Sequence, residues 1–245
     1  MGELQGRVAI VTGSTRGIGK AVAARLAAEG ASVVVHGRDA AVCADVAAGL
    51  PGAMGFAADL SVAGSADALV DAAVAAHGRL DIVVNNAGVA IDNFITGVTD
   101  ERWDATIATN LSGPFAVLRA AARVMKTGGG GAIVNVISWA GERGNVGQIA
   151  YAASKAGLHA VTLSAAKELG KFGITVNAIC PGMIDTELTR EHASDELLER
   201  LAASYPVPRL GTAIEVADLI CFAASEAAGY ITGASLDING GDLMM

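Results

Sequence analysis

The sequence predicts an α/β fold, a doubly wound parallel sheet in a single domain over residues 1–245. Short apolar runs rich in β-branched residues alternate with longer segments of helix composition along most of the chain. These runs are continuously apolar, as strands covered by helices on both faces require. The 245 residues include 52% hydrophobic and 17% charged residues, which is enough apolar side chain for one large core.

Each predicted element follows from its local composition. The first strand, Val8–Val11, is entirely apolar, and a Gly-rich turn joins it to an alanine-rich helix around Ala21–Ala28, which stops at Gly30. The same unit then recurs, with strands at Ser32–Val35, Met54–Ala57, Leu80–Val84, Ala132–Ser138, Ile174–Cys180 and Ser235–Ile238. Helices are predicted at Asp39–Ala48, Ser61–Ala76, Asp100–Lys126, Tyr151–Gly170 and Ile214–Ala224.

Residues 186–208 break this alternation. They are charged, have a helical pattern and end in the sequence Tyr205-Pro206-Val207-Pro208. We interpret them as a mobile lid over a site and not as a second domain.

Composition excludes several classes of function. With 17 Lys+Arg against 25 Asp+Glu the net charge is −8, which disfavours a nucleic-acid partner. The longest stretch without a charged side chain, residues 127–141, is Gly-rich and shorter than the roughly 18 residues of a membrane span. The three cysteines and four histidines show no metal-ligand spacing, so no metal site is predicted. No secretion signal follows Met1, and a cytoplasmic location is expected.

The Gly-rich turn after the first strand carries the first functional signal. Its glycines permit a tight turn that brings backbone N–H groups and a helix N-terminus toward a pyrophosphate, as in Rossmann-type folds. By itself such a loop could also be a tight turn without a ligand, but its place after an N-terminal strand favours a dinucleotide. The predicted phosphate-binding residues are Gly13, Ser14, Arg16, Gly17, Ile18 and Gly19.

The G-x-x-x-G-x-G spacing of this turn resembles that of the short-chain dehydrogenase/reductase family, and the resemblance covers essentially the whole chain. Five further motifs stand in the family's order: Asn85-Asn86-Ala87-Gly88, Asn110, Ser138, the Tyr151-x-x-x-Lys155 pair and Pro181-Gly182. The resemblance implies an oxidoreductase that transfers hydride to or from a nicotinamide dinucleotide. It also implies the catalytic group Asn110, Ser138, Tyr151 and Lys155.

The chemistry of these residue types suits carbonyl reduction. Tyr151 and Lys155 are four apart in a helical segment, so both lie on one face, and an ammonium beside the phenol is expected to lower the pKa of Tyr151. Ser138 can hydrogen-bond the substrate oxygen and the phenol. By resemblance, Lys155 also binds the nicotinamide ribose, and Asn110 holds a water that relays protons to Lys155.

The end of the second strand predicts which nicotinamide is used. An acidic residue there would bind the ribose 2′-hydroxyl of NAD, but His36 takes its place and Arg38 follows. Arg38 and Arg16 together suit a 2′-phosphate, so NADP is predicted. Asp39 is more simply the N-cap of the next helix.

The remaining predicted cofactor contacts come from the resemblance. Asp59 and Leu60 resemble the segment that holds the adenine, although Asp59 could equally cap a helix beginning near Ser61. The other predicted contacts are Asn86, Ala87, Gly88, Tyr151, Lys155, Pro181, Gly182, Ile184 and Thr186.

Several segments, among them Gly144–Tyr151 and Asn239-Gly240-Gly241, look most like bacterial 3-oxoacyl-acyl-carrier-protein reductases. This implies a homotetramer that reduces small-molecule or carrier-bound 3-oxoacyl thioesters in fatty-acid or polyketide synthesis. The expected substrate contacts are Ser138, Trp139, Gln148 and Tyr151. Arg123, Lys126, Lys167 and Lys171 are either a docking patch for an acidic carrier or cations that complement helix dipoles.

Three questions stay open: the substrate, the place of Glu142 and Arg143, and the role of His159. The chain could act on a free secondary alcohol or ketone, such as a steroid, a sugar or a small metabolite, or it could bind a dinucleotide without turnover. Glu142 and Arg143 either line the substrate pocket, in a loop after Ser138, or are solvated. His159 continues the i, i+4 series of Tyr151 and Lys155, but it is better interpreted as a helix-packing or subunit-interface residue.

Overall fold

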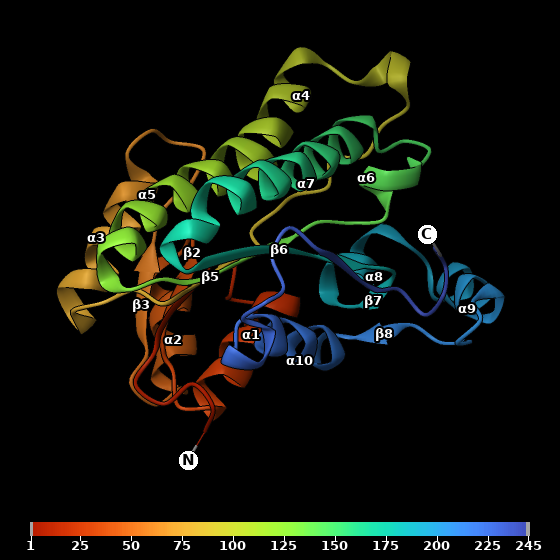
Figure 1. Ribbon diagram of the computed structural model, residues 1–245. Coiled ribbons are helices and arrows are strands. Elements are labelled where there is room, and N and C mark those ends of the chain that lie inside the picture. The colour runs from red at the N-terminus through yellow and green to blue at the C-terminus, as the bar shows by residue number, and fades with distance from the viewer. Residues whose placement is uncertain (1, 244–245) are drawn as a thin grey trace.

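Seven parallel strands form the central sheet of the computed structural model, which describes residues 2–243 (Figure 1). Their order in space is β3-β2-β1-β4-β5-β6-β9. The strands are β1 (Val8–Val11), β2 (Ser32–Gly37), β3 (Met54–Ala57), β4 (Ile82–Asn85), β5 (Gly131–Val136), β6 (Ile174–Pro181) and β9 (Ser235–Ile238). Because the order reverses between β1 and β4, the loops that follow these two strands diverge and leave a crevice at their carboxyl ends.

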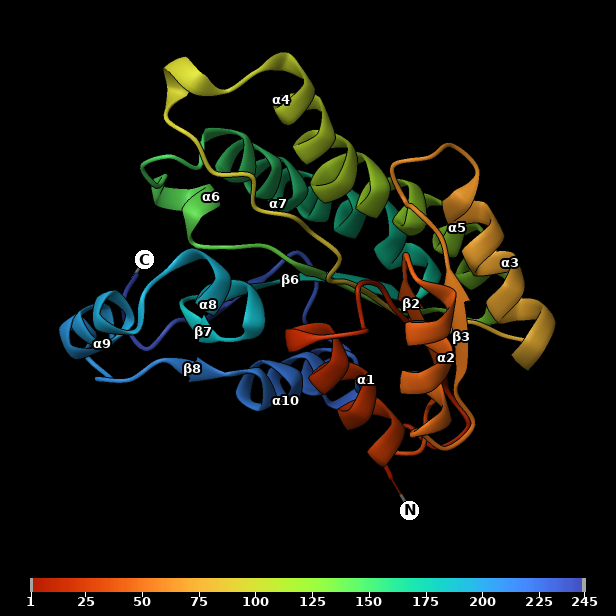
Figure 2. The ribbon, with the colours of Figure 1, turned by 180° about the vertical axis from the view of Figure 1, so that it is seen from behind.

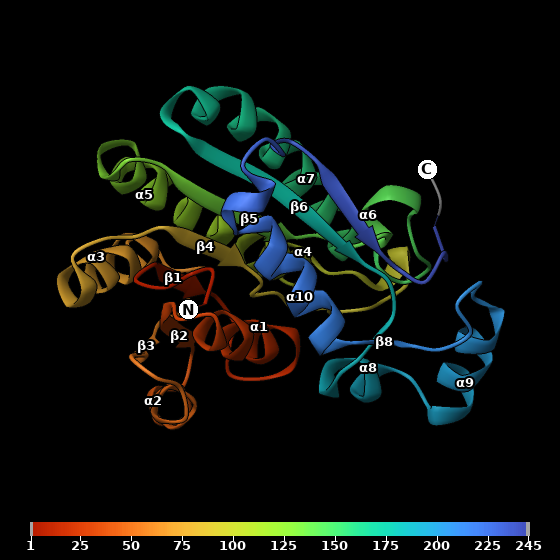
Figure 3. The ribbon, with the colours of Figure 1, turned by 60° about the horizontal axis from the view of Figure 1, so that its bottom comes forward.

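Helices cover both faces of the sheet (Figures 2 and 3). One layer holds α1 (Gly17–Ala28), α2 (Ala40–Ala48) and α10 (Ala213–Ala223); the other holds α3 (Ser65–His77), α4 (Asp100–Ile107), α5 (Gly113–Gly128) and α7 (Ile149–Leu169). Along β1, Ala9 and Val11 enter the core under α1 and α10, while Val8 and Ile10 enter the core under α3, α5 and α7. Strand β1 thus supplies two separate cores, as its continuous apolar run predicted.

The predicted doubly wound α/β fold is confirmed, and most boundaries fall within a few residues. β3 and β9 have the predicted bounds. The segment predicted as one helix, Asp100–Lys126, is divided into α4 and α5 by a π-helical turn at Ala108–Ser112. The helix predicted from Ser61 begins only at Ser65, because Gly64 has a φ of 87° that a helix cannot contain.

Residues 186–208 fold as helices outside the sheet, which agrees with the helical pattern of their sequence. α8 (Glu187–His192) begins at its N-cap Thr186, and α9 (Asp195–Ser204) begins at its N-cap Ser194. A two-stranded parallel pair, β7 (Ile184–Asp185) with β8 (Gly211–Thr212), fastens both ends of this segment. Figure 3 shows α8 and α9 projecting beyond the carboxyl ends of β6 and β9. The mobility of the lid stays a prediction.

The longest helix, α7, has 21 residues and carries Lys155 in its second turn and Lys167 and Glu168 at its C-terminal end. Over residues 2–243 no helix combines the length and the apolar character that crossing a membrane requires. α7 instead packs against β6 and places its N-terminal turn at the end of the sheet where α6 (Ala140–Arg143) lies (Figure 1).

Candidate active site

The Gly-rich turn after β1 is fastened to the end of β4. The hydroxyl of Thr12 accepts hydrogen bonds from the backbone N–H groups of Asn86 and Ala87, both at 3.0 Å. In return, the Asn86 side chain donates to the carbonyls of Thr12 and Gly13 at 3.0 and 3.1 Å. The Asn86 side chain fits against the turn only because Gly19 lacks a Cβ, which would lie 2.4 Å from the amide nitrogen of Asn86.

This turn fits the phosphates of a dinucleotide. Gly17, at a φ of 54°, begins α1, and the N-cap Arg16 makes no side-chain hydrogen bond to the first turn. The N-terminal N–H groups of α1 are therefore free of a side-chain cap and are suited to an anion. A Cβ at Gly17 would lie 3.7 Å from the Thr186 side chain, so the segment after β6 reaches the turn.

Lys155 is a buried ammonium at the centre of the site. Only 4% of its surface is exposed, and its Nζ donates to the carbonyl of Val136, at the end of β5, at 2.7 Å. Burial lowers the pKa of Lys155 to about 8. Its Nζ also lies 5.6 Å from the centre of the Tyr151 ring, one helical turn earlier on α7.

Asn110 lies in the π-helical turn between α4 and α5, a distortion that often marks functional sites. The buried Asn110 amide is held from two sides. It exchanges two hydrogen bonds of 2.8 Å with the backbone of Val89 and donates to Ser154 at 3.2 Å. A Cβ at Gly88 would lie 3.3 Å from Asn110 Oδ1 and 3.6 Å from Lys155 Nζ, so Asn110 and Lys155 flank Gly88 from two helices.

Ser138 follows β5 and faces Tyr151. Its hydroxyl accepts from the Ala140 N–H at 3.2 Å and hydrogen-bonds the Tyr151 phenol. Directly after it, Trp139 enters a buried cluster with Ile137 and Leu158, which leaves little of the indole open to a substrate.

An apolar cleft of about 370 Å³ borders the first turn of α7. Its floor is fastened by hydrogen bonds across two loops: Asn93 donates to the Gly147 carbonyl at 2.8 Å, and Gln148 donates to Asp92 at 3.0 Å. Gln148 thus lies at the rim, three residues before Tyr151. The lining residues are Asn93, Phe94, Ile95, Gly144, Asn145, Val146, Gly147, Ile149 and Ala152.

Comparisons with known proteins agree with this geometry. A family model described as enoyl-(acyl carrier protein) reductase matches residues 13–242. The chain is 40% identical to the (3R)-3-hydroxyacyl-CoA dehydrogenase of Mus musculus, over 98% of each chain. It is also 40% identical to the 3-oxoacyl-[acyl-carrier-protein] reductase FabG of Escherichia coli, over 98% of this chain and 99% of the relative.

The chain belongs to the short-chain dehydrogenase/reductase family. Its fold is similar to a crystal structure from Sinorhizobium meliloti, provisionally described as a short-chain alcohol dehydrogenase, with a TM-score of 0.92 at 36% identity. That match covers 97% of this chain and 96% of the other. Membership makes the chain an oxidoreductase that binds a nicotinamide dinucleotide, and the predicted resemblance is confirmed.

One expectation for this short-chain dehydrogenase/reductase is wrong. Lys155 does not lower the pKa of Tyr151; burial raises the phenol's pKa above its ordinary value of 10, and the hydrogen bond from Ser138 only partly opposes the change. The reason is that the Lys155 ammonium is directed at the Val136 carbonyl. Burial therefore moves both pKa values toward the neutral forms of the pair.

Two further expectations are corrected. Residues 140–143 form a helix, α6, and not a loop. The Arg143 guanidinium stacks over the Trp139 ring at 4.0 Å and pairs with Asp242. The Glu142 side chain is buried against β6 and β9. Neither residue lines the cleft. Asp59 accepts from the Ser61 N–H at 2.9 Å, so it closes a turn and does not cap α3, which begins four residues after Ser61.

The other predicted residues lie around the same crevice. Asp39 caps α2 as predicted, accepting from the N–H groups of Ala41 and Val42. Arg16 pairs with Glu191 of α8 at 2.8 Å. His159 packs inside the chain, with its Nδ1 4.0 Å from Glu142. Among the rest, Ser14 and Leu60 are buried beside the turn and under α5, while Pro181, Gly182 and Ile184 follow the end of β6.

His36 has a role that sequence reasoning missed. Its side chain does not point to the position of a ribose but lies beneath the turn, 3% exposed. Nδ1 accepts from the Gly13 N–H at 3.3 Å, and Nε2 lies 3.2 Å from the Ala58 carbonyl, an arrangement that requires a neutral imidazole. Burial lowers the pKa of His36.

We expect this imidazole to make stability fall in mild acid. In the unfolded chain His36 has its ordinary pKa of 6.5, and the folded value is lower, so the unfolded state binds more protons between the two. The contribution of the neutral His36 imidazole to the free energy of unfolding is complete above pH 6.5. It is lost as the pH falls through the pKa that His36 has in the folded chain. Each kcal/mol lost lowers Tm by about 2–4 °C. His36→Asn, which keeps an acceptor for Gly13, should flatten the dependence of Tm on pH in this window.

The measurement is thermal unfolding across the mildly acidic range. His77→Asn, which removes a histidine from the end of α3, is the matched control. An equal dependence of Tm on pH in His36→Asn and in the unmodified chain would contradict this role.

Proposed function

We propose that the chain reduces the ketone of a 3-oxoacyl thioester to the 3-hydroxyacyl thioester with NADPH. The observation that carries the proposal is the apolar cleft at the first turn of α7, the helix that also carries Tyr151 and Lys155. Ser138 and Asn110 lie next to that helix. Two relatives at 40% identity, in mouse and in Escherichia coli, are named for the two directions of this conversion. They support the acyl substrate over other carbonyl compounds.

Each residue has a distinct part in the reaction. The bound dihydronicotinamide supplies a hydride to the carbonyl carbon. Ser138 and Tyr151 hold the carbonyl oxygen, and the Tyr151 phenol, neutral because burial raises its pKa, donates the proton that completes the alcohol. Lys155, held on the Val136 carbonyl with its Nζ 5.6 Å from the centre of the Tyr151 ring, would bind the nicotinamide ribose, and Asn110 fixes the backbone of Val89 next to Gly88.

NADPH is favoured over NADH by charge at the end of β2. No carboxylate occupies that position: His36 is directed under the turn, and Asp39 is used as the N-cap of α2. Arg38 is exposed close enough to Asp59 to lower the pKa of that carboxyl, and Arg16 lies on the turn itself. Two guanidinium groups suit a 2′-phosphate through charge-assisted hydrogen bonds.

Arg38→Asp should lower kcat/KM for NADPH about 10- to 150-fold, the range of 1.5–3 kcal/mol typical of a hydrogen bond to a charged group. The kcat/KM for NADH should change much less, so that the preference for NADPH over NADH narrows or inverts. Steady-state kinetics with both cofactors measures this, and Arg102→Asp, at an exposed arginine of α4, controls for the change of charge. Equal kcat/KM for the two cofactors in the unmodified protein would refute the assignment.

Tyr151→Phe should lower kcat by about 10²–10⁴-fold, because the ring persists while the proton donor is lost. NADPH binding, measured by fluorescence titration, should stay within about twofold of normal. Tyr230→Phe, at a fully exposed tyrosine, is the matched control. Lys155→Ala should weaken both turnover and cofactor binding. Near-normal turnover by Tyr151→Phe would mean that another group supplies the proton.

The cleft favours a chain-bearing substrate. Phe94, Ile95 and Val146 are exposed apolar residues on two loops at its walls, and an acyl chain laid across them would bury their surface. The two alternatives are a free secondary alcohol or ketone and a fold that only binds a dinucleotide. The site retains all four catalytic residues, which disfavours the second.

The proposed docking patch for a carrier is in the wrong place on a single chain. Lys167 and Lys171 lie at the far end of α7, and α7 separates Lys167 from Tyr151 by about 24 Å at about 1.5 Å per residue. Arg123 pairs with Asp67, while Lys126 and Lys171 flank the Phe172 ring. This patch gives no reason to prefer a carrier protein over coenzyme A. The homotetramer and the cytoplasmic location stay predictions from the resemblance.

A substrate panel tests the function. With NADPH, we expect reduction of 3-oxoacyl thioesters on both coenzyme A and carrier protein, with kcat/KM rising with acyl length. Val146→Asp should lower kcat/KM for a long acyl chain about tenfold, equivalent to about 1.4 kcal/mol, while changing that for a four-carbon chain little. Good turnover of free ketones without turnover of any thioester would overturn the proposal in favour of the first alternative.

A further inference from the structure

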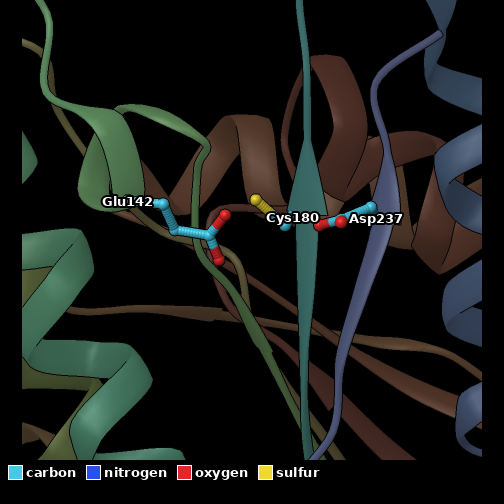
Figure 4. Close-up of side chains that lie close together, drawn as sticks. All are labelled: Glu142, Cys180 and Asp237. Carbon is cyan, nitrogen blue, oxygen red and sulfur yellow. The ribbon is translucent and has the colours of Figure 1, made fainter. Parts of the chain in front are cut away.

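Behind the catalytic loop lies a second group of reactive side chains that the reaction does not use. Glu142 of α6, Cys180 of β6 and Asp237 of β9 converge from three elements (Figure 4). One carboxylate oxygen from each acid and the Cys180 Sγ all lie within 4.8 Å of one another. Sequence spacing predicted no metal site here, because the three residues are distant along the chain.

The Glu142 carboxylate points into this group without a partner. Its side chain is 9% exposed, and neither of its oxygens makes a hydrogen bond of normal geometry with any part of residues 2–243. The buried hydroxyl of Ser235, two residues before Asp237, also makes no hydrogen bond of normal geometry, although it lies close enough to Glu142 to lower the pKa of that carboxyl. A buried carboxylate without a donor is costly, so this arrangement calls for a proton or a cation.

The charges of Glu142, Cys180 and Asp237 also favour a bound proton or cation. Burial, and then the charge of Asp237, raise the pKa of Glu142, and burial with the charges of Glu142 and Asp237 raises that of the Cys180 thiol. The His159 imidazole, 4.0 Å from Glu142, is the nearest group that could carry a compensating positive charge. With both acids and the thiol ionised, the group has a charge of about −3, which a divalent cation reduces to about −1.

We propose that Glu142, Cys180 and Asp237 bind a divalent transition-metal ion of the Zn²⁺ type. A thiolate with carboxylates selects zinc or cobalt over magnesium or calcium, which take oxygen ligands only. Bonds of about 2.0–2.3 Å place tetrahedral ligands roughly 3.5 Å apart, so the side chains need to close by about an ångström. Asp237 is exposed on its side of β9, which provides the path of entry and the place for a water ligand.

The ion would act as a structural tie. α6 follows Ser138 directly, and Cys180 precedes Pro181-Gly182 at the end of β6. A cation bound by residues of α6, β6 and β9 would join the segment that follows Ser138 to the edge of the sheet. Its metal–ligand bonds would be stronger than the packing contacts of α6 alone. The inference does not depend on the identity of the substrate.

Cobalt is the probe, because a bond to thiolate gives a charge-transfer absorption that oxygen ligands do not. Protein stripped with a chelator and titrated with Co²⁺ at neutral pH should gain this band with one equivalent per chain. Zn²⁺ should remove the band and raise Tm. Because bound thiol must lose its proton, apparent affinity should rise with pH.

Three variants distinguish Co²⁺ binding at this site from Co²⁺ binding elsewhere on the chain. Cys180→Ser should abolish the band, and Glu142→Gln should weaken Co²⁺ binding at least tenfold. Cys221→Ser, at another buried thiol that does not belong to this group, should leave both unchanged. Circular dichroism and thermal melts confirm that each variant is folded. No charge-transfer band in the unmodified chain, or one that persists in Cys180→Ser, overturns the proposal.

Discussion

The hydrogen bonds between the end of β1 and the end of β4 are the constraint on which the site depends. Thr12 and Asn86 hold each other at the point where the strand order reverses, so the cofactor turn cannot move independently of the segment that follows β4. That segment continues to Gly88, which lies against Asn110 and Lys155. The turn that would bind phosphate and the residues that would transfer the proton lie on different helices. Both are therefore positioned by the same contact between the ends of β1 and β4.

Burial explains the electrostatic state of Tyr151 and Lys155, the proposed catalytic pair. Removing water penalises charge on Tyr151 and on Lys155 alike, so the pKa of the phenol rises while that of the Lys155 ammonium falls to about 8. A phenol that stays protonated is the required proton donor for reduction. Oxidation of an alcohol requires the phenolate, so the same burial disfavours the reverse reaction.

The fold could be predicted because local sequence patterns encode it, and the same kind of pattern supports the proposed catalytic group. Continuous apolar runs give parallel strands, and Tyr151 and Lys155 share a face at a spacing of four. Side-chain direction could not be predicted in the same way. His36 turns under the phosphate loop and Glu142 turns toward β6 because of packing between elements distant in the sequence, and Asn110 lies in a π-helical turn that no local pattern indicated.

The lid is connected to the cofactor site through charge. Arg16 pairs with Glu191 of α8, and Thr186, the N-cap of α8, lies next to Gly17. Both partners of the ion pair are more than half exposed, so the pair is worth about 0–1 kcal/mol. A 2′-phosphate bound as proposed offers Arg16 a stronger, doubly charged partner. A 2′-phosphate in the place of Glu191 would remove this one contact between α8 and the turn at modest cost.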